Sequence, residues 1–210
     1  MLTSLKPLVL ATALASLLAT AAGAQAEITV YTTQAAFLGA TGTPGVDSFD
    51  DLALDIYDEA LNRTAGGYTY QVSAAGGLFG AGTGSDHWLS SNLRLSPIVF
   101  QDFSSGVNAF GGNFFGSDIG GQYLPNANLI LTAADGSSLT YTLSGATQAS
   151  FVGFVSDVAL TSVSLSTDGG LYWPTANDVV LAVAEPATYG MLLAGLGCVG
   201  AIARRRGRRT

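Results

Sequence analysis

The side chains best suited to chemistry in this chain are carboxylates that gather in one short segment. Asp50, Asp51, Asp55, Asp58 and Glu59 fall within ten consecutive residues. Two carboxyl groups that flank a glycosidic bond can hydrolyse it, and several carboxylate oxygens can bind Ca²⁺, which extracellular modules hold at about 10⁻⁴–10⁻³ M. Because spacing along the chain does not set the separation that hydrolysis requires, we expect calcium to be the better use of these groups.

Three aspartates are the candidate calcium ligands: Asp50 and Asp51 in this segment, and Asp178 near the end of the body of the chain. The sequence contains no EF-hand loop or other motif with metal-ligand spacing. The alternative is a solvated acidic face that binds nothing. Calcium is therefore the one candidate cofactor, and we expect no other.

A catalytic triad is the second chemistry to consider, because His87 is the only histidine and lies beside Ser85 and Asp86. Adjacent residues on an extended segment or loop point in different directions, and the chain has no Gly-x-Ser-x-Gly motif. A single histidine without a nearby cysteine also gives zinc no ligand set. We predict a surface histidine, no catalytic residue and a body that is not an enzyme, with a polysaccharide hydrolase as the rival hypothesis.

Two tryptophans could bind carbohydrate. Trp88 follows His87, and Trp173 lies between Tyr172 and Pro174, both in segments rich in Gly and Asp. An exposed indole can stack on a sugar ring while nearby carboxylates and amides bind its hydroxyl groups, but tryptophan is more often at least partly buried. Trp88 and Trp173 are therefore candidates for polysaccharide contact, although a role in the core is the interpretation we favour.

Charge excludes one class of partner. Residues 27–184 contain 14 Asp and Glu against only Arg63 and Arg94, which is a net charge of −12. Nucleic-acid binding depends on Lys and Arg that neutralise phosphates, so we expect no nucleic-acid partner. The only cysteine is Cys198, so the body has no disulfide and must be held together by its apolar core.

Short strands separated by turns must position these groups. The clearest hairpin joins residues 128–132 to 139–143 through Asp135-Gly136, because alternating apolar residues flank an Asp-Gly pair. Helix is expected only at 33–38 and 52–61. The pattern predicts an all-β fold, an antiparallel, jelly-roll-like β-sandwich. Its other expected strands are 28–31, 68–72, 98–103, 107–114, 150–155, 160–166 and 179–183.

The N-terminus has the organisation of a Sec signal peptide. Lys6 precedes an apolar stretch at 8–22, and Ala24-Gln25-Ala26 matches the small-x-small pattern cut by signal peptidase. We predict cleavage after Ala26, with an uncleaved membrane anchor as the alternative. The Sec machinery is then a partner, and the mature chain begins at Glu27.

The C-terminus has the organisation of a membrane anchor. Residues 187–203 form an uncharged, mostly apolar run of 17 residues, at the short end of what can span a bilayer as a transmembrane helix. Arg204, Arg205, Arg206, Arg208 and Arg209 follow it, and the positive-inside rule places these charges in the cytoplasm and the body on the far side. The alternative is a buried core helix with a solvated tail.

The last 26 residues resemble a PEP-CTERM sorting signal. The resemblance is carried by Glu185-Pro186 and by the apolar span followed by Arg204, Arg205 and Arg206, with Ala184 where the family has its first Pro. It implies a Gram-negative bacterium in which exosortase removes the anchor, so that the inner membrane holds the protein only transiently. It also implies a final location at the cell surface or in the exopolysaccharide matrix of a biofilm.

A second resemblance concerns the body. Residues 151–157, 161–166 and 177–181, together with Phe49-Asp50-Asp51-Leu52, are similar to segments of jelly-roll domains found in PEP-CTERM proteins. The expected organisation is a signal peptide at 1–26, a β-sandwich at 27–184 and a sorting signal at 185–210. The expected function is that of an exported surface or matrix protein with a structural or carbohydrate-binding body.

Overall fold

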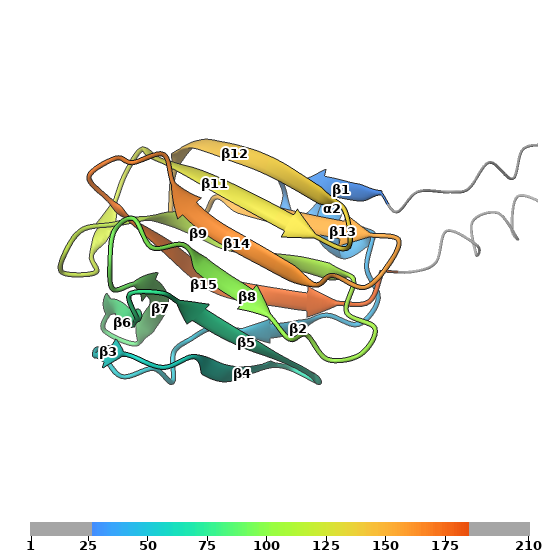
Figure 1. The fold of residues 1–210 in the computed structure, drawn as a ribbon, viewed down its shortest axis with the longest axis horizontal. Helices are drawn as coiled ribbons and strands as arrows, with labels where there is room; N and C mark the ends of the chain where they lie inside the picture. Colours follow the sequence, from blue (N-terminus) through green and yellow to red (C-terminus); the bar gives the residue numbers. More distant parts are fainter. Residues whose placement is uncertain (1–26, 185–210) are drawn as a thin grey trace, which may run out of the picture.

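The protein is a sandwich of two antiparallel β-sheets, as the strand pattern predicts (Figure 1). A computed structural model describes residues 27–184, so the expected signal peptide and sorting signal lie outside the described residues. Within 27–184, no helix is both long and apolar enough to cross a membrane.

The first sheet has nine strands. Seven of them lie side by side in the order β1 (Ile28–Tyr31), β13 (Phe151–Ser156), β9 (Ala109–Ser117), β15 (Trp173–Ala182), β7 (Asp86–Ser91), β6 (Leu78–Thr83) and β3 (Ile56–Tyr57). Two further strands pair with members of this row: β10 (Tyr123–Leu124) with β9, and β2 (Gly45–Asp47) with β15.

The second sheet has six strands, in the order β12 (Ser138–Ala146), β11 (Ala127–Ala134), β14 (Ser162–Thr167), β8 (Ile98–Gln101), β5 (Tyr68–Ala74) and β4 (Leu61–Ala65). Its strands alternate as the sequence predicts. In β11, every second residue is buried, and the predicted Asp135-Gly136 turn leads into β12, with Gly136 at φ 110°. One face of the sheet therefore packs on the core and the other meets solvent.

Phenylalanines from both sheets fill the space between them. Phe100 of β8 packs against Phe110 of β9 with ring centroids 4.9 Å apart, and Phe110 stacks on Phe114 at 6.3 Å. All three side chains are fully buried. Such aromatic pairs supply much of the apolar burial that a domain without disulfides needs.

The outer face of the nine-stranded sheet is also partly covered. At one end, Phe37 of helix α2 (Gln34–Gly39) packs on Phe151 with ring centroids 5.5 Å apart. At the other end, Trp88 and Phe115 pack edge to face at 5.4 Å, and Tyr123 adds to the same cluster. These two small clusters bury residues that a simple one-sided sheet would expose.

The fold differs from the sequence prediction between residues 52 and 61, where a helix was expected. This segment forms turns followed by β3, and β4 begins at Leu61. The Asp55 carboxylate accepts a hydrogen bond from the N–H of Ile56 (2.8 Å), and the Tyr57 hydroxyl accepts one from the N–H of Ala53 (2.9 Å). These side-chain bonds compete with the helical backbone pattern and stabilise the turns instead.

The last strand, β15, is longer than predicted and begins at Trp173 rather than at 179. Its pairing with β9 shifts between Asn177 and Val180, and Asp178 there has φ 47°. Alternation breaks at such a bulge because the extra residue changes which side faces the core. The sequence pattern therefore showed only the part of the strand beyond the bulge.

Candidate functional site

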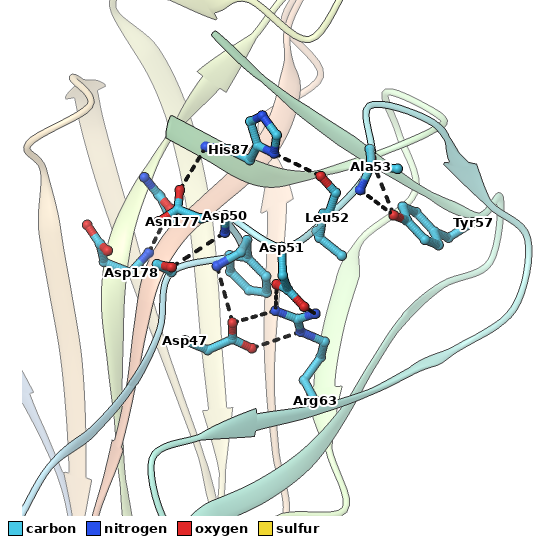
Figure 2. Close-up of polar contacts among 12 residues, drawn as sticks. Asp47, Asp50, Asp51, Leu52, Ala53, Tyr57, Arg63, His87, Asn177 and Asp178 are labelled. Atoms are coloured by element: carbon cyan, nitrogen blue, oxygen red, sulfur yellow. Dashed lines mark hydrogen bonds and ion pairs between the residues drawn. The ribbon is translucent and has the colours of Figure 1, made fainter. Parts of the chain in front are cut away.

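The acidic segment is tied to β4 by a single arginine (Figure 2). Arg63 donates to both carboxylate oxygens of Asp47, at 2.9 and 2.6 Å, and to both oxygens of Asp51, at 2.8 and 2.6 Å. We call Asp47, Asp51 and Arg63 the aspartate–arginine clamp. It joins the end of β2 and the loop that follows to β4.

Further contacts fix the clamp from its buried side. The Tyr70 hydroxyl donates to Asp47 at 2.7 Å, and the N–H of Phe49 donates to the same carboxylate at 3.2 Å. Phe49 is fully buried at φ 63°, with the Arg63 guanidinium 5.3 Å from the centre of its ring. A bulky residue adopts this left-handed conformation only where its surroundings hold it, so the clamp and Phe49 support each other.

The surroundings of the clamp shift the pKa values of Asp51, Arg63 and the neighbouring Tyr70. Hydrogen bonds from Arg63 lower the pKa of Asp51. Burial raises the pKa of Tyr70, and the nearby Asp47 carboxylate raises it further. Burial would lower the pKa of Arg63, but the hydrogen bonds to Asp47 and Asp51 outweigh it and raise that pKa. The clamp is thus an ion-paired structural unit.

The predicted calcium site is not formed by Asp50, Asp51 and Asp178. Asp51 binds Arg63, while Asp50 lies on the other side of the loop and accepts a hydrogen bond from the N–H of His87 (3.1 Å) (Figure 2). Among residues 27–184, no group of three or more His, Cys, Asp or Glu side chains is placed to hold a metal ion. The Arg63 guanidinium supplies to Asp51 the positive charge that a cation would have supplied.

Asp50 and Asp178 nevertheless lie near each other and differ in protonation behaviour. The hydrogen bond from the N–H of His87 lowers the pKa of Asp50. Partial burial raises the pKa of Asp178, and the nearby Asp86 and Asp50 carboxylates add to this rise. Asn113 donates to Asp178 at 3.3 Å. Environments that push the pKa values of two carboxyl groups apart are typical of acid and base pairs in glycosidases.

His87 does not form the triad that its neighbours suggested. Its Nδ1 lies 2.8 Å from the carbonyl oxygen of Leu52, and Asp86 accepts a hydrogen bond from the Asn177 side-chain amide at 3.2 Å. A carbonyl oxygen can only accept, so Nδ1 carries the proton. The ring therefore helps to hold the acidic loop against β7, and its Nδ1 is not available as a base.

Trp88 belongs to the core, so the interpretation that it contacts polysaccharide is wrong. Its side chain is 1% exposed, packs on Phe115 and donates its indole N–H to the carbonyl oxygen of Gly121 at 2.9 Å. Its place is the outer cluster of the nine-stranded sheet, which residues near Gly121 cover. No ring face is left for a ligand.

Trp173 has a different environment. It is partly exposed at the start of β15 and lines a surface hollow of about 510 Å³, the Trp173 hollow. The volume lies within the range of about 300–1,000 Å³ that is usual for small-molecule sites. Its indole N–H donates to the carbonyl oxygen of Asn92 at 3.3 Å. The residues around the hollow are Ile56, Phe79, Ser90, Ser91, Asn92, Leu93, Arg94, Asp118, Ile119 and Trp173.

Two charged side chains at the hollow are held by backbone groups. Arg94 donates to the carbonyl oxygens of Gly170 (2.6 Å) and Gly169 (3.3 Å). One Asp118 oxygen accepts from the N–H groups of Gly120 (2.8 Å) and Gln122 (2.9 Å). These bonds fix both charges beside the indole without an ion pair between them.

The rest of the hollow was not expected from the sequence. Asn92, Arg94 and Asp118 come from two loops that are distant in sequence, and only the fold brings them to Trp173. The sequence does hold one indication of these loops, in the positions of Leu93 and Ile119, whose side chains are 56% and 84% exposed in the structure. Apolar residues among Asn, Asp and Gly, outside any alternating pattern, mark loops that present side chains to solvent.

Comparisons of this chain with protein-family models, with curated proteins and with solved structures found no match.

Proposed function

We propose that residues 27–184 form a non-catalytic carbohydrate-binding body and that the Trp173 hollow is its binding site. The single observation that carries the proposal is the composition of the hollow. A partly exposed indole lies beside an amide, a guanidinium and a carboxylate, all held in place. Sugar rings have apolar faces that stack on indoles and hydroxyl edges that bond such polar groups.

The position of the hollow supports this role. The pairing register aligns Thr29 near the start of β1, through Val155 and Ala109, with Ala182 at the end of β15. Trp173 lies at the other end of β15, about 30 Å away at a rise of about 3.3 Å per residue. A chain held at its C-terminus would thus present the hollow away from its attachment, as Figure 1 shows for the two ends of β15.

The proposal includes export and sorting. The Sec-type N-terminus and the resemblance to a PEP-CTERM signal support delivery across the inner membrane, processing by exosortase, and a final place at the surface or in the matrix of a Gram-negative cell. We assign the body to the jelly-roll class within this proposal, because neighbouring strands in both sheets are mostly distant in sequence. An exopolysaccharide of that matrix is the natural ligand.

Intact-mass spectrometry of membrane and matrix fractions tests the sorting part. A matrix species that starts at Glu27 and lacks residues after Pro186 is the expected result. A membrane-bound species that still ends at Thr210 would contradict it.

A glycan array with a matched pair of variants tests the binding part. Trp173→Ala is expected to abolish binding to the recognised glycan, since stacking on the indole is lost. Leu171→Ala removes a neighbouring side chain that is 80% exposed and does not line the hollow, so it serves as the control. Equal binding by both variants, or no binding by the wild-type chain to any glycan, would refute the proposal.

A polysaccharide hydrolase is the second candidate, and one observation favours it. The pKa of Asp178 is raised while that of Asp50 is lowered, so one carboxyl group could donate a proton beside an ionised partner. The hollow of about 430 Å³ at the acidic loop includes Asp50 but not Asp178, which favours binding over hydrolysis. Release of reducing sugar that disappears in both Asp178→Asn and Asp50→Asn would establish the hydrolase instead.

A further inference from the structure

Strand β12 forms one edge of the six-stranded sheet. It pairs with β11 on one side, and no other strand within residues 27–184 pairs with its opposite side (Figure 1). Its nine residues, Ser-Leu-Thr-Tyr-Thr-Leu-Ser-Gly-Ala, include no charge and no proline. Edge strands of soluble proteins usually carry a charged residue or a proline, which prevents pairing with another chain. The opposite edge strand, β4, does contain a charge, Arg63.

The first seven residues of β12 read the same in both directions around Tyr141. Residues 138–144 are Ser-Leu-Thr-Tyr-Thr-Leu-Ser. When a strand pairs antiparallel with a second copy of itself, residues equally far from the centre face each other. With Tyr141 at the centre, every cross-strand pair would therefore join two residues of the same type.

The free backbone groups of β12 can be assigned from its neighbours. The carbonyl oxygens of Asn128 and Ala134 accept bonds from the N–H groups of Asp168 and Thr161, on the side of β14. Even-numbered residues of β11 thus face β14, and odd-numbered ones face β12. Leu131 pairs with Tyr141, so Tyr141 uses its backbone groups toward β11.

The backbone groups of the residues on either side of Tyr141 must then point away from β11. Ser138, Thr140, Thr142 and Ser144 direct their N–H and C=O groups to the open edge, because backbone direction alternates along a strand. Their side chains are exposed, whereas Leu139, Tyr141 and Leu143 are partly buried against the core. The edge thus offers both its backbone groups and a row of half-covered apolar side chains.

We propose that β12 pairs antiparallel with β12 of a second copy of this chain, on a twofold axis through Tyr141. Thr140 of each copy then faces Thr142 of the other, and Ser138 faces Ser144. These pairs form about eight backbone hydrogen bonds. Hydroxyl side chains meet on the outer face, while leucine meets leucine on the inner face, and both kinds of pair stabilise a sheet.

Charge also favours this edge as the contact. Two bodies of net charge −12 repel each other over most of their surfaces. The pairing described brings together segments that contain no ionised side chain. Dimerisation joins two six-stranded sheets into one continuous sheet and covers the apolar row of each copy. This partner is independent of the carbohydrate proposed for the Trp173 hollow.

Disulfide trapping in the full-length chain tests the proposal, with Cys198→Ser as the background. Tyr141 meets its own copy across a non-hydrogen-bonded pair with Cα atoms about 4.5 Å apart, within the range that a disulfide spans. Tyr141→Cys is expected to give at least about tenfold more covalent dimer on non-reducing gels than Thr64→Cys on β4.

Register is tested by two further variants. Leu139→Cys and Leu143→Cys each lie about 13 Å from their own copies in the proposed pairing, so neither cross-links alone. They face each other between copies, so mixing the two variants is expected to give a covalent heterodimer. Cross-linking of Tyr141→Cys no stronger than that of Thr64→Cys would overturn the proposal.

A second pair of variants, which differ in charge, tests the pairing if a cysteine variant fails to fold. The exposed side chains of Thr140 and Thr142 are both changed to Lys in one variant and both to Glu in another. Each is expected to be monomeric in sedimentation, and a mixture of the two to restore the dimer. Asn62→Lys/Thr64→Lys on β4 is the control and keeps the dimer. A wild-type chain that is monomeric at all concentrations, or a Lys pair that still dimerises, would refute the pairing.

Discussion

Arg63→Ala tests the aspartate–arginine clamp, because this substitution leaves a buried carboxylate without its cation. The Asp47 side chain is only 4% exposed and that of Arg63 11% exposed. In the variant, Asp47 retains only its bonds from Tyr70 and Phe49. Removal of one partner from a buried ion pair costs about 3–5 kcal/mol of the free energy of unfolding.

The other half of the clamp contributes far less. The Asp51 side chain is 70% exposed, so solvent screens its attraction to Arg63. Asp51→Ala is therefore expected to cost about 0–1 kcal/mol. Arg63→Ala should therefore lower the free energy of unfolding several times more than Asp51→Ala does, and this difference is the firmest part of the prediction.

Urea unfolding at neutral pH measures these free energies, with Arg94→Ala as the matched control. Arg94 bonds only backbone carbonyls of the 169–170 turn, and its loss should cost about 1 kcal/mol or less. The double variant Asp47→Ala/Arg63→Ala should be more stable than the sum of the single effects predicts. If Arg63→Ala and Arg94→Ala cost the same within about 0.5 kcal/mol, the clamp is not an important stabilising unit.

Three further predictions concern stability and can be checked by thermal or urea denaturation. Trp88→Ala should lower the free energy of unfolding by about 3–5 kcal/mol, whereas Trp173→Ala should cost less than half as much; equal losses would contradict their different burial. Because the pKa of Asp178 is raised above the unfolded value near 3.8, its ionisation destabilises the fold as pH rises through the folded pKa. Asp178→Asn should therefore raise Tm at pH 7 by about 1–2 °C and have no such effect at pH 3, and a lower Tm at pH 7 would contradict the assignment. Gly45→Ala places a Cβ 1.9 Å from the carbonyl oxygen of Ala65 and should cost about 3 kcal/mol or more, while Gly67→Ala, with nothing within 4 Å, should be close to neutral; equal stabilities would refute this steric argument.

The sequence predicted most clearly the hairpin whose strands have one face in solvent, and it missed β6 and β7. The hairpin of β11 and β12 alternates with period two and turns at Asp-Gly, so its pattern was visible. Strands β6 and β7 lie where Trp88 and Phe115 form a cluster on the outer face of their sheet. Burial on both faces removes the alternation that a one-sided sheet shows.

Of the residues that line the Trp173 hollow, the sequence singled out only Trp173 as a candidate. The sequence prediction makes Asp51 a calcium ligand, but in the structure Asp51 binds Arg63 of β4, a strand of the six-stranded sheet. Trp173 was identified together with Trp88, and only burial separates them. Loops set the surroundings of Trp173, and loop geometry follows from tertiary contacts that no local pattern specifies.

A fluorescence titration tests the central claim most directly, because the chain has only two tryptophans. In Trp88→Phe, which retains an aromatic ring in the core cluster, Trp173 is the only source of indole emission. Exopolysaccharide isolated from the producing cells is added, and emission is recorded at each concentration. Our account predicts a saturable change in intensity or wavelength as the sugar covers the Trp173 hollow. Emission that stays constant up to saturating polysaccharide would contradict it.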